Sequence, residues 1–221
     1  MIKFEHTEVV GWEHAIRGMR NPLNSWEKMD SKTIRIMDEI TDECIGFQFD
    51  VGPNDIDLMT RLRNAGTDHR KFMRMLTVYV DITAPLYWWK EFDTYKVGTV
   101  ANSCSTMHKI HTKEFTLGDF SHEHLLDGDD WEATPLSCLE AVIGQLNWWR
   151  MKFLDSKDKK YWWQMIQLLP TSYNQKRTVM LNYEVLANIY KSRRNHKLDE
   201  WHTFCDWAAE LPHFKELILD P

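Results

Sequence analysis

Three adjacent tryptophan pairs limit what this chain can fold into more than any other feature. They are Trp88-Trp89, Trp148-Trp149 and Trp162-Trp163. A tryptophan ring buries a large apolar area, but its N–H group needs an acceptor, so adjacent pairs indicate wide aromatic packing surfaces. Such surfaces suit helix interfaces or contacts between subunits. With 221 residues the chain is long enough for one sizeable core, and we expect a single domain over residues 1–221.

Composition and charge exclude several classes of function. Hydrophobic residues make up 43% of the chain, which is typical of a globular protein and not of a disordered one. The 27 basic and 33 acidic residues give a net charge of -6, so we expect no nucleic-acid partner, although a local basic patch for a small anion stays open. No apolar run reaches the roughly 18 residues of a membrane span and no signal peptide opens the chain. We therefore expect a cytoplasmic protein without a membrane partner.

Cysteine and histidine spacing does not predict a metal site. The four cysteines are Cys44, Cys104, Cys138 and Cys205. None of them forms a C-x-x-C motif, and a reducing cytosol with free thiols is the simplest setting. The pairs His108/His111 and His122/His124 lack a third spaced ligand. Cys104 would become a nucleophile if a helix terminus or a histidine lowered its pKa, but the sequence places no such partner for it.

Breaker residues and hydrophobic periodicity divide the chain into helices and strands. They predict helices around 12–19 and over 55–66, 86–98, 135–154, 159–169, 172–195 and 198–211. Asn54 or Asp55 is the expected cap of the second of these helices. The run 75–83 is rich in β-branched and aromatic residues and indicates a strand that ends at Pro85, whereas 24–53 gives no clear pattern and 112–134 reads as a loop. These elements predict an α+β fold, mostly helical, with a small mixed sheet and a long C-terminal helix.

The helix predicted over 172–195 carries polar residues among apolar ones. At about 100° per residue, Asn182 and Arg193 nearly eclipse each other on it, while Glu184 and Asn188 fall on another side. One interpretation is a solvated stripe whose cations at residues 191–197 complement the helix dipole. The other is a helix that lines a polar pocket.

The stretch LLPTSYNQKRTVMLNYEVLANIYKSRRNH resembles the flavin-dependent thymidylate synthase family of the ThyX type. That family has Leu-Pro, an aromatic residue, and then Asn, Leu, Asn and Arg at the same spacings, which fall here on Leu169-Pro170, Tyr173, Asn182, Leu186, Asn188 and Arg193. The resemblance implies that Asn182 and Asn188 help to bind FAD. It also implies that Arg193 contacts the base of dUMP and activates it. The family works as a homotetramer whose active sites are shared between subunits.

The stretch FDTYKVGTVANSCSTMHK occupies the place of the family's arginine-rich signature, Arg-His-Arg-x-x-Ser-x-Asn-Glu-x-Ser-x-Arg-Tyr. Asn102 and Ser105 match that signature, and the resemblance gives Asn102 to the cofactor site. The Arg-His-Arg triplet is replaced by Tyr95-Lys96-Val97, Ser103 replaces the glutamate, and Met107-His108 replaces Arg-Tyr. An alternative interpretation is a turn cluster, because serine and asparagine side chains often bond to nearby backbone.

Two further departures concern the flavin. Arg74 stands where the family has a flavin-contacting histidine, and Glu184 stands where it has an arginine. With most signature arginines gone, Lys96, Ser103, Ser105 and His108 are the expected phosphate-binding groups, with Arg193 near the base. Lysine is a point charge without the two-pronged geometry of arginine, so the phosphate would be held differently.

The resemblance implies a divergent flavin-dependent enzyme that transfers a methyl or one-carbon unit to a dUMP-like pyrimidine deoxynucleotide. The family's FAD carries the hydride, while the protein supplies binding, orientation and electrostatics. Two alternatives stay open: a catalytically inactive nucleotide-binding protein on the same fold, and a structural or interaction protein without a small ligand.

Overall fold

The structure is a computed structural model that describes residues 2–128 and 133–219. The chain forms two compact units. Unit 1 comprises residues 1–5, 81–96 and 101–179, and unit 2 comprises 6–80, 97–100 and 180–221. Residues 129–132 of the loop predicted over 112–134 lie outside the described part of the chain. Among the described residues, no helix is long and apolar enough to cross a membrane.

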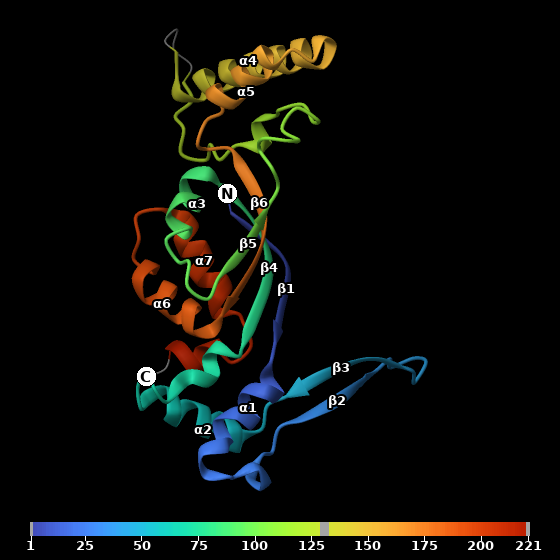
Figure 1. Cartoon of the computed structure of the whole chain (residues 1–221), viewed down its shortest axis with the longest axis vertical. Coiled ribbons are helices and arrows are strands. Elements are labelled where there is room, and N and C mark those ends of the chain that lie inside the picture. The colour runs from blue at the N-terminus through green and yellow to red at the C-terminus, as the bar shows by residue number, and fades with distance from the viewer. Residues whose placement is uncertain (1, 129–132, 220–221) are drawn as a thin grey trace. The chain divides into compact units, whose positions relative to one another are not determined.

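A small four-stranded sheet and a two-stranded sheet make up the β structure (Figure 1). The first sheet contains β1 (Lys3–Val10), β4 (Thr77–Pro85), β6 (Asn174–Asn182) and β5 (Val100–Ser103), in that order across the sheet. The second is an antiparallel hairpin of β2 (Lys32–Met37) and β3 (Cys44–Asp50), in which Ile34 lies opposite Gln48. The hairpin lies within residues 24–53, where no clear pattern predicts an element.

Unit 1 packs aromatic residues around three helices. They are α3 (Leu86–Phe92), α4 (Pro135–Ser156) and α5 (Lys159–Leu168), with a 3₁₀ segment, η4 (Leu117–Asp119). Trp88 and Trp89 are fully buried, and the Trp89 Nε1 donates to the carbonyl of Gln175 at 2.9 Å. The first tryptophan pair is therefore a core feature of this unit. In contrast, Trp148 and Trp163 on α4 and α5 are exposed.

Unit 2 contains the remaining helices. They are α1 (Trp12–Arg20), α2 (Pro53–Asn64), α6 (Tyr183–Arg193), α7 (Asp199–Ala209), the 3₁₀ segments η1 (Asn21–Leu23), η2 (Trp26–Lys28) and η3 (Arg70–Arg74), and the π-helical turn η5 (Lys215–Leu219). A buried ion pair joins α1 to α2, because Arg20 Nη2 lies 2.6 Å from Asp55 Oδ1 and both side chains are almost fully enclosed. The Tyr183 hydroxyl donates to the carbonyl of Pro212 at 2.6 Å.

The predicted fold class is confirmed, as an α+β fold that is mostly helical. The strand near 75–83 and the helices that became α1, α2, α4, α5 and α7 are also confirmed. The small sheet is antiparallel and not mixed. Helix α3 ends at Phe92 and not near Gly98, since Thr94 closes the turn through a bond from its hydroxyl to the Glu91 carbonyl.

The predicted cap of α2 is wrong. Gly52 is the N-cap and makes no side-chain capping bond, and Pro53 follows in the first turn. The first backbone N–H groups are satisfied from a distant residue, because the Asp30 carboxylate accepts from Asn54 N at 2.9 Å and from Asp55 N at 3.1 Å. A cap supplied from 24 residues away leaves no local signature.

The long helix predicted over 172–195 is also wrong in its first half. Residues 174–182 form strand β6, and α6 begins only at Tyr183. Val179 and Leu181 are buried while their neighbours are more exposed, which is the two-residue period of a strand. Because Val179 also lies four residues before Tyr183, the same apolar positions satisfied a helical period. Asn182 and Arg193 therefore do not eclipse each other on one helix; Asn182 precedes α6 and Arg193 ends it.

Candidate functional site

Asn182 stands at the junction of β6 and α6. It is the N-cap of α6, and its Oδ1 accepts a hydrogen bond from the Val185 N–H at 3.1 Å. Gly98 lies against this junction in the left-handed region, with φ of 78°. A Cβ on Gly98 would come within 3.0 Å of both Asn182 Nδ2 and Val185 Cγ2, so only glycine allows this approach. Asn182 thus has a structural role as well as the cofactor role that the resemblance implies.

Glu184, on the first turn of α6, binds two arginines of η3. Its side chain is only 10% exposed. Arg74 donates to Oε2 through Nε and to Oε1 through Nη2, and Arg70 Nε lies 3.3 Å from Oε1. The hydrogen bond from Arg74 holds the pKa of Glu184 below its ordinary value despite burial, and the same bond raises the pKa of Arg74. The two residues that depart from the family pattern on the flavin side are therefore in direct contact.

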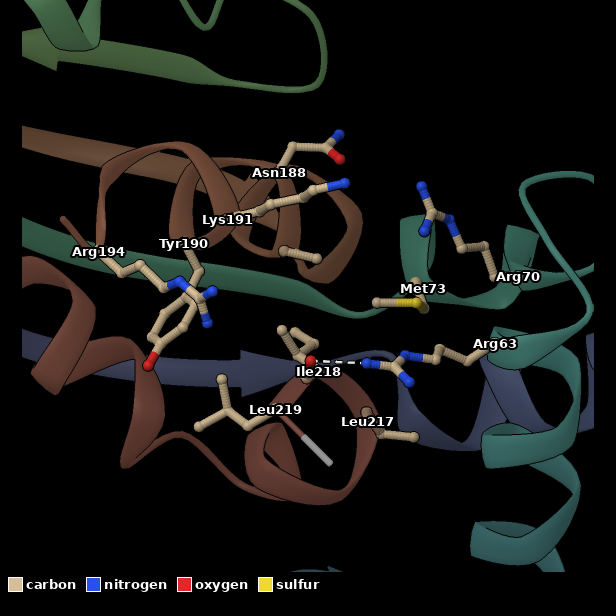
Figure 2. Close-up of a pocket in the computed structure, with 11 residues that line it drawn as sticks. Arg63, Arg70, Met73, Asn188, Tyr190, Lys191, Arg194, Leu217, Ile218 and Leu219 are labelled. Atoms are coloured by element: carbon tan, nitrogen blue, oxygen red, sulfur yellow. Dashed lines mark hydrogen bonds between the residues drawn. The ribbon is translucent and has the colours of Figure 1, made fainter. Parts of the chain in front are cut away.

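Asn188 faces a cavity of about 340 Å³ within unit 2 (Figure 2). Four cationic side chains also line it, Arg63, Arg70, Lys191 and Arg194, together with Tyr190. Buried Met73 and Leu217 form part of its apolar wall. Positive charge against an apolar wall suits an anionic ligand, because the wall reduces solvent screening of the charges.

Arg193, the last residue of α6, lies against α7. Its guanidinium carbon is 4.8 Å from the centroid of the Trp201 ring. A guanidinium over an indole face is a favourable cation–π pair and fixes the direction of the side chain. Trp201 itself is fully buried, so the ring is a rigid support.

The part of the signature stretch that lies in unit 1 contains a local turn. Ser105 Oγ accepts from the N–H groups of Met107 at 3.1 Å and of His108 at 3.0 Å, which is the arrangement of a turn cluster. Asn102 and Ser103 belong to β5 and are exposed. Lys96 and His108 are exposed as well. The exposed groups are thus accessible to a ligand, while Ser105 already supports the turn.

A second cavity of about 340 Å³ lies within unit 1 beside this turn. Cys104, Ser105, Lys109, Lys113 and Tyr173 are among the residues that line it. Burial raises the pKa of Tyr173, with further contributions from Asp119 and Cys104. The exposed thiol of Cys104 is free. Within the described ranges, no group of three or more potential ligands could hold a metal ion.

The structure brings the predicted residues together only in part. Asn182, Asn188 and Arg193 lie on or beside α6, and Arg74 joins them through Glu184. Sequence patterns do not predict a site role for Arg63 or Arg70, nor the ion-pairing role of Glu184, because the partners of these residues lie far away in sequence. Lys191 and Arg194 were noticed, but as cations that complement the helix dipole.

The fold is that of the ThyX-type flavin-dependent thymidylate synthases, as the resemblance predicted. A ThyX from Helicobacter pylori, crystallised with FAD and dUMP, superposes with a TM-score of 0.64 at 14% identity, over 99% of this chain and 97% of that one. The UMP/dUMP methylase PolB from Streptomyces cacaoi, bound with 5-Br dUMP, gives a TM-score of 0.59 at 13% identity, over 98% and 93%. No family sequence model and no curated protein sequence matches the chain.

Proposed function

We propose that this protein is a divergent flavin-dependent enzyme that transfers a methyl or one-carbon unit to a dUMP-like pyrimidine deoxynucleotide. The observation that carries the proposal is the shared fold over 99% of the chain, combined with Asn182, Asn188 and Arg193 at the family's spacings around α6. Neighbours with this fold are a thymidylate synthase crystallised with FAD and dUMP and a UMP/dUMP methylase. We also propose, from the resemblance, a cytoplasmic homotetramer.

The residues around α6 fit the chemistry of FAD. Asn188 offers amide donors and acceptors at a cavity that four cationic side chains also line, which suits a cofactor with a diphosphate. We assign Asn182, Asn188, Asn102 and Arg74 to cofactor binding. When bound, FAD supplies the hydride chemistry.

The other site residues that the resemblance implies are proposed to bind the nucleotide. We assign Lys96, Ser103, Ser105 and His108 to the phosphate and sugar of the nucleotide, and Arg193 to the base. A cation near the pyrimidine carbonyl stabilises the negative charge that develops when C5 becomes nucleophilic. Support by Trp201 keeps the guanidinium in one orientation, which reduces the entropy lost when substrate binds.

A second candidate is a nucleotide-binding protein without catalysis. Glu184 neutralises Arg74, and Ser105 is engaged in its own turn, so two positions implied by the resemblance already have structural partners. A protein that kept the scaffold and lost the cofactor would show these features.

Thermal unfolding with added ligands separates the candidates. For the enzyme, FAD and dUMP should each raise the melting temperature, and radiolabel from a one-carbon donor should reach dUMP only when FAD is present. Stabilisation by dUMP without any effect of FAD would favour the non-catalytic binder. If neither ligand stabilises the protein, both proposals fail and the structural or interaction role gains support.

A further inference from the structure

We propose that the cationic cavity of unit 2 is a binding site for a chain of two or three phosphate groups. The cavity has a volume of about 340 Å³ and lies among α2, η3, α6 and the π-helical turn η5 (Figure 2). This inference deepens the proposed function, which assigns a cofactor with a diphosphate to the same cavity. It rests on that proposal only for the identity of the molecule that carries the phosphates.

The charge of the lining supports an oligophosphate over a single phosphate. Arg63, Arg70, Lys191 and Arg194 bring positive charge, and among the described residues that line the cavity none is acidic. Glu184 offsets part of this charge through its contact with Arg70. One phosphate monoester carries only about 1.5 to 2 negative charges near pH 7, whereas a diphosphate or triphosphate offers more charge along its length.

The cations come from three separate elements. Arg63 lies in the last turn of α2, and Arg70 begins η3. Lys191 and Arg194 lie three residues apart at the C-terminal end of α6. The dipole of α6 accounts for cations on α6 itself. It does not account for Arg63 and Arg70, which reach the same cavity from other parts of the chain. Lys191 extends from α6 toward Arg70 in Figure 2.

Two of these guanidinium groups are held in place. Arg63 donates from Nη1 to Asn64 Oδ1 at 2.7 Å and from Nη2 to the carbonyl of Ile218 at 2.7 Å, so η5 anchors it. Arg70 Nε donates to Glu184 Oε1 at 3.3 Å. Lys191 and Arg194 are exposed, and their long side chains can adjust to a ligand. Fixed arginines with adjustable neighbours are typical of sites that bind phosphate oxygens.

Isothermal titration of the full chain at low salt, with inorganic orthophosphate, pyrophosphate and tripolyphosphate, tests the proposal. We expect pyrophosphate and tripolyphosphate to bind at least about tenfold more tightly than orthophosphate, with affinity falling as salt rises. Lys191→Gln and Arg194→Gln should each weaken pyrophosphate binding about tenfold. Lys197→Gln is the matched control, because Lys197 is exposed, follows the same helix and does not line the cavity.

Three outcomes would overturn the proposal: pyrophosphate does not bind, it binds no better than orthophosphate, or the control loses as much affinity as the cavity variants. Unchanged melting temperatures would show that the variants are folded. A variant that fails to fold is replaced by Lys191→Met, which removes the charge, keeps much of the side-chain length and should weaken pyrophosphate binding about as much as Lys191→Gln.

Competition identifies the molecule that carries the phosphates. If FAD displaces pyrophosphate and riboflavin does not, the diphosphate belongs to the cofactor. If dUTP displaces it and FAD does not, the cavity takes a nucleoside triphosphate. If pyrophosphate binds and FAD does not, the phosphate site is supported and the proposed flavin enzyme is refuted. If FAD binds equally well to the wild type and to Lys191→Gln while pyrophosphate does not bind, the phosphate site is refuted and the proposed flavin enzyme is supported.

Discussion

Arg74 and Glu184 form an ion pair between η3 and the first turn of α6. By the resemblance, each replaces a different residue of the ThyX pattern, so the two changes compensate each other electrostatically. A histidine and an arginine at these places would leave the α6 start positive, whereas this pair with Arg70 keeps a carboxylate there. The two departures from the family pattern are therefore coupled through one contact.

Removing the charge of Glu184 should destabilise the protein. In Glu184→Gln the two arginines lose their anionic partner, and we expect a loss of about 1–2 kcal/mol, less than for a fully buried pair because the Arg74 side chain is 54% exposed. Urea unfolding at pH 7 measures the change. Glu210→Gln is the control, since its side chain is 78% exposed and its contact with Lys215 is long, at 3.6 Å. Equal effects of the two substitutions would contradict the role assigned to Glu184.

The same carboxylate predicts a pH dependence. The pKa of Glu184 is lower in the folded state than its ordinary value of 4.5, so the unfolded state binds more protons. The stabilisation that the ionised Glu184 gives the folded protein is fully present above the pKa of the unfolded state. It is lost as the pH falls through the pKa of the folded state. The stability difference between wild type and Glu184→Gln should therefore narrow below about pH 4.5. A constant difference down to pH 3 would argue against this linkage.

Substitution in the buried pair of Arg20 and Asp55 should destabilise the protein more than substitution in an exposed ion pair. Asp55 is fully buried; burial alone would raise its pKa, but hydrogen bonds from Ser31 and Arg20 and from backbone N–H groups together lower it. Asp55→Ala leaves a buried arginine without its partner and should cost about 3–5 kcal/mol. Asp57→Ala breaks an exposed pair with Arg61 on the same helix and should cost at most about 0.5 kcal/mol. Denaturant midpoints of the two variants provide the comparison.

Asn182 and Asn188 should differ in what they contribute. Asn182→Ala removes the α6 cap and should cost about 1 kcal/mol, while Asn182→Ser keeps a capping oxygen. Asn188 is exposed, so Asn188→Ala should change stability by less than about 0.5 kcal/mol. If both asparagines bind FAD, Asn182→Ser and Asn188→Ala should weaken FAD binding at nearly unchanged stability. Normal FAD titrations of both variants would remove them from the cofactor site.

Arg193 should act in turnover more than in binding. If it stabilises negative charge on the pyrimidine, Arg193→Ala should lower kcat about 10²- to 10³-fold, with a smaller change in KM for dUMP. Arg193→Lys keeps the charge without the planar fork and should recover part of kcat. A change in KM alone would assign Arg193 to ground-state binding.

Much of the fold was predictable because local signals were strong. Pro135 opens α4 at its first turn and Pro85 closes β4, and each follows directly from the fixed φ and missing N–H of proline. Strand β6 was not predicted, because its buried positions fit both the helical period and the two-residue period of a strand. The pairing of β6 with β4 and β5 decides between helix and strand, and it is not encoded in the nine residues of β6 itself.

The candidate site was predictable only where the family pattern survives. Asn182 and Asn188 could be named from spacing, whereas Arg63 meets Ile218 across 155 positions. The contact between Arg74 and Glu184 spans 110 positions. The sequence therefore shows that both residues depart from the family pattern, but not that their charges pair with each other. Ion pairs between residues far apart in sequence produce no local periodic pattern, so they cannot be inferred from the sequence alone.

The visible absorption spectrum tests the central claim most directly. Purified protein should be incubated with FAD, freed of unbound cofactor by gel filtration, and measured across the flavin bands, alongside Asn188→Ala. We predict that the wild-type protein retains flavin absorbance and that Asn188→Ala retains clearly less. A folded wild-type protein that emerges colourless, with no FAD binding by titration, would contradict the account.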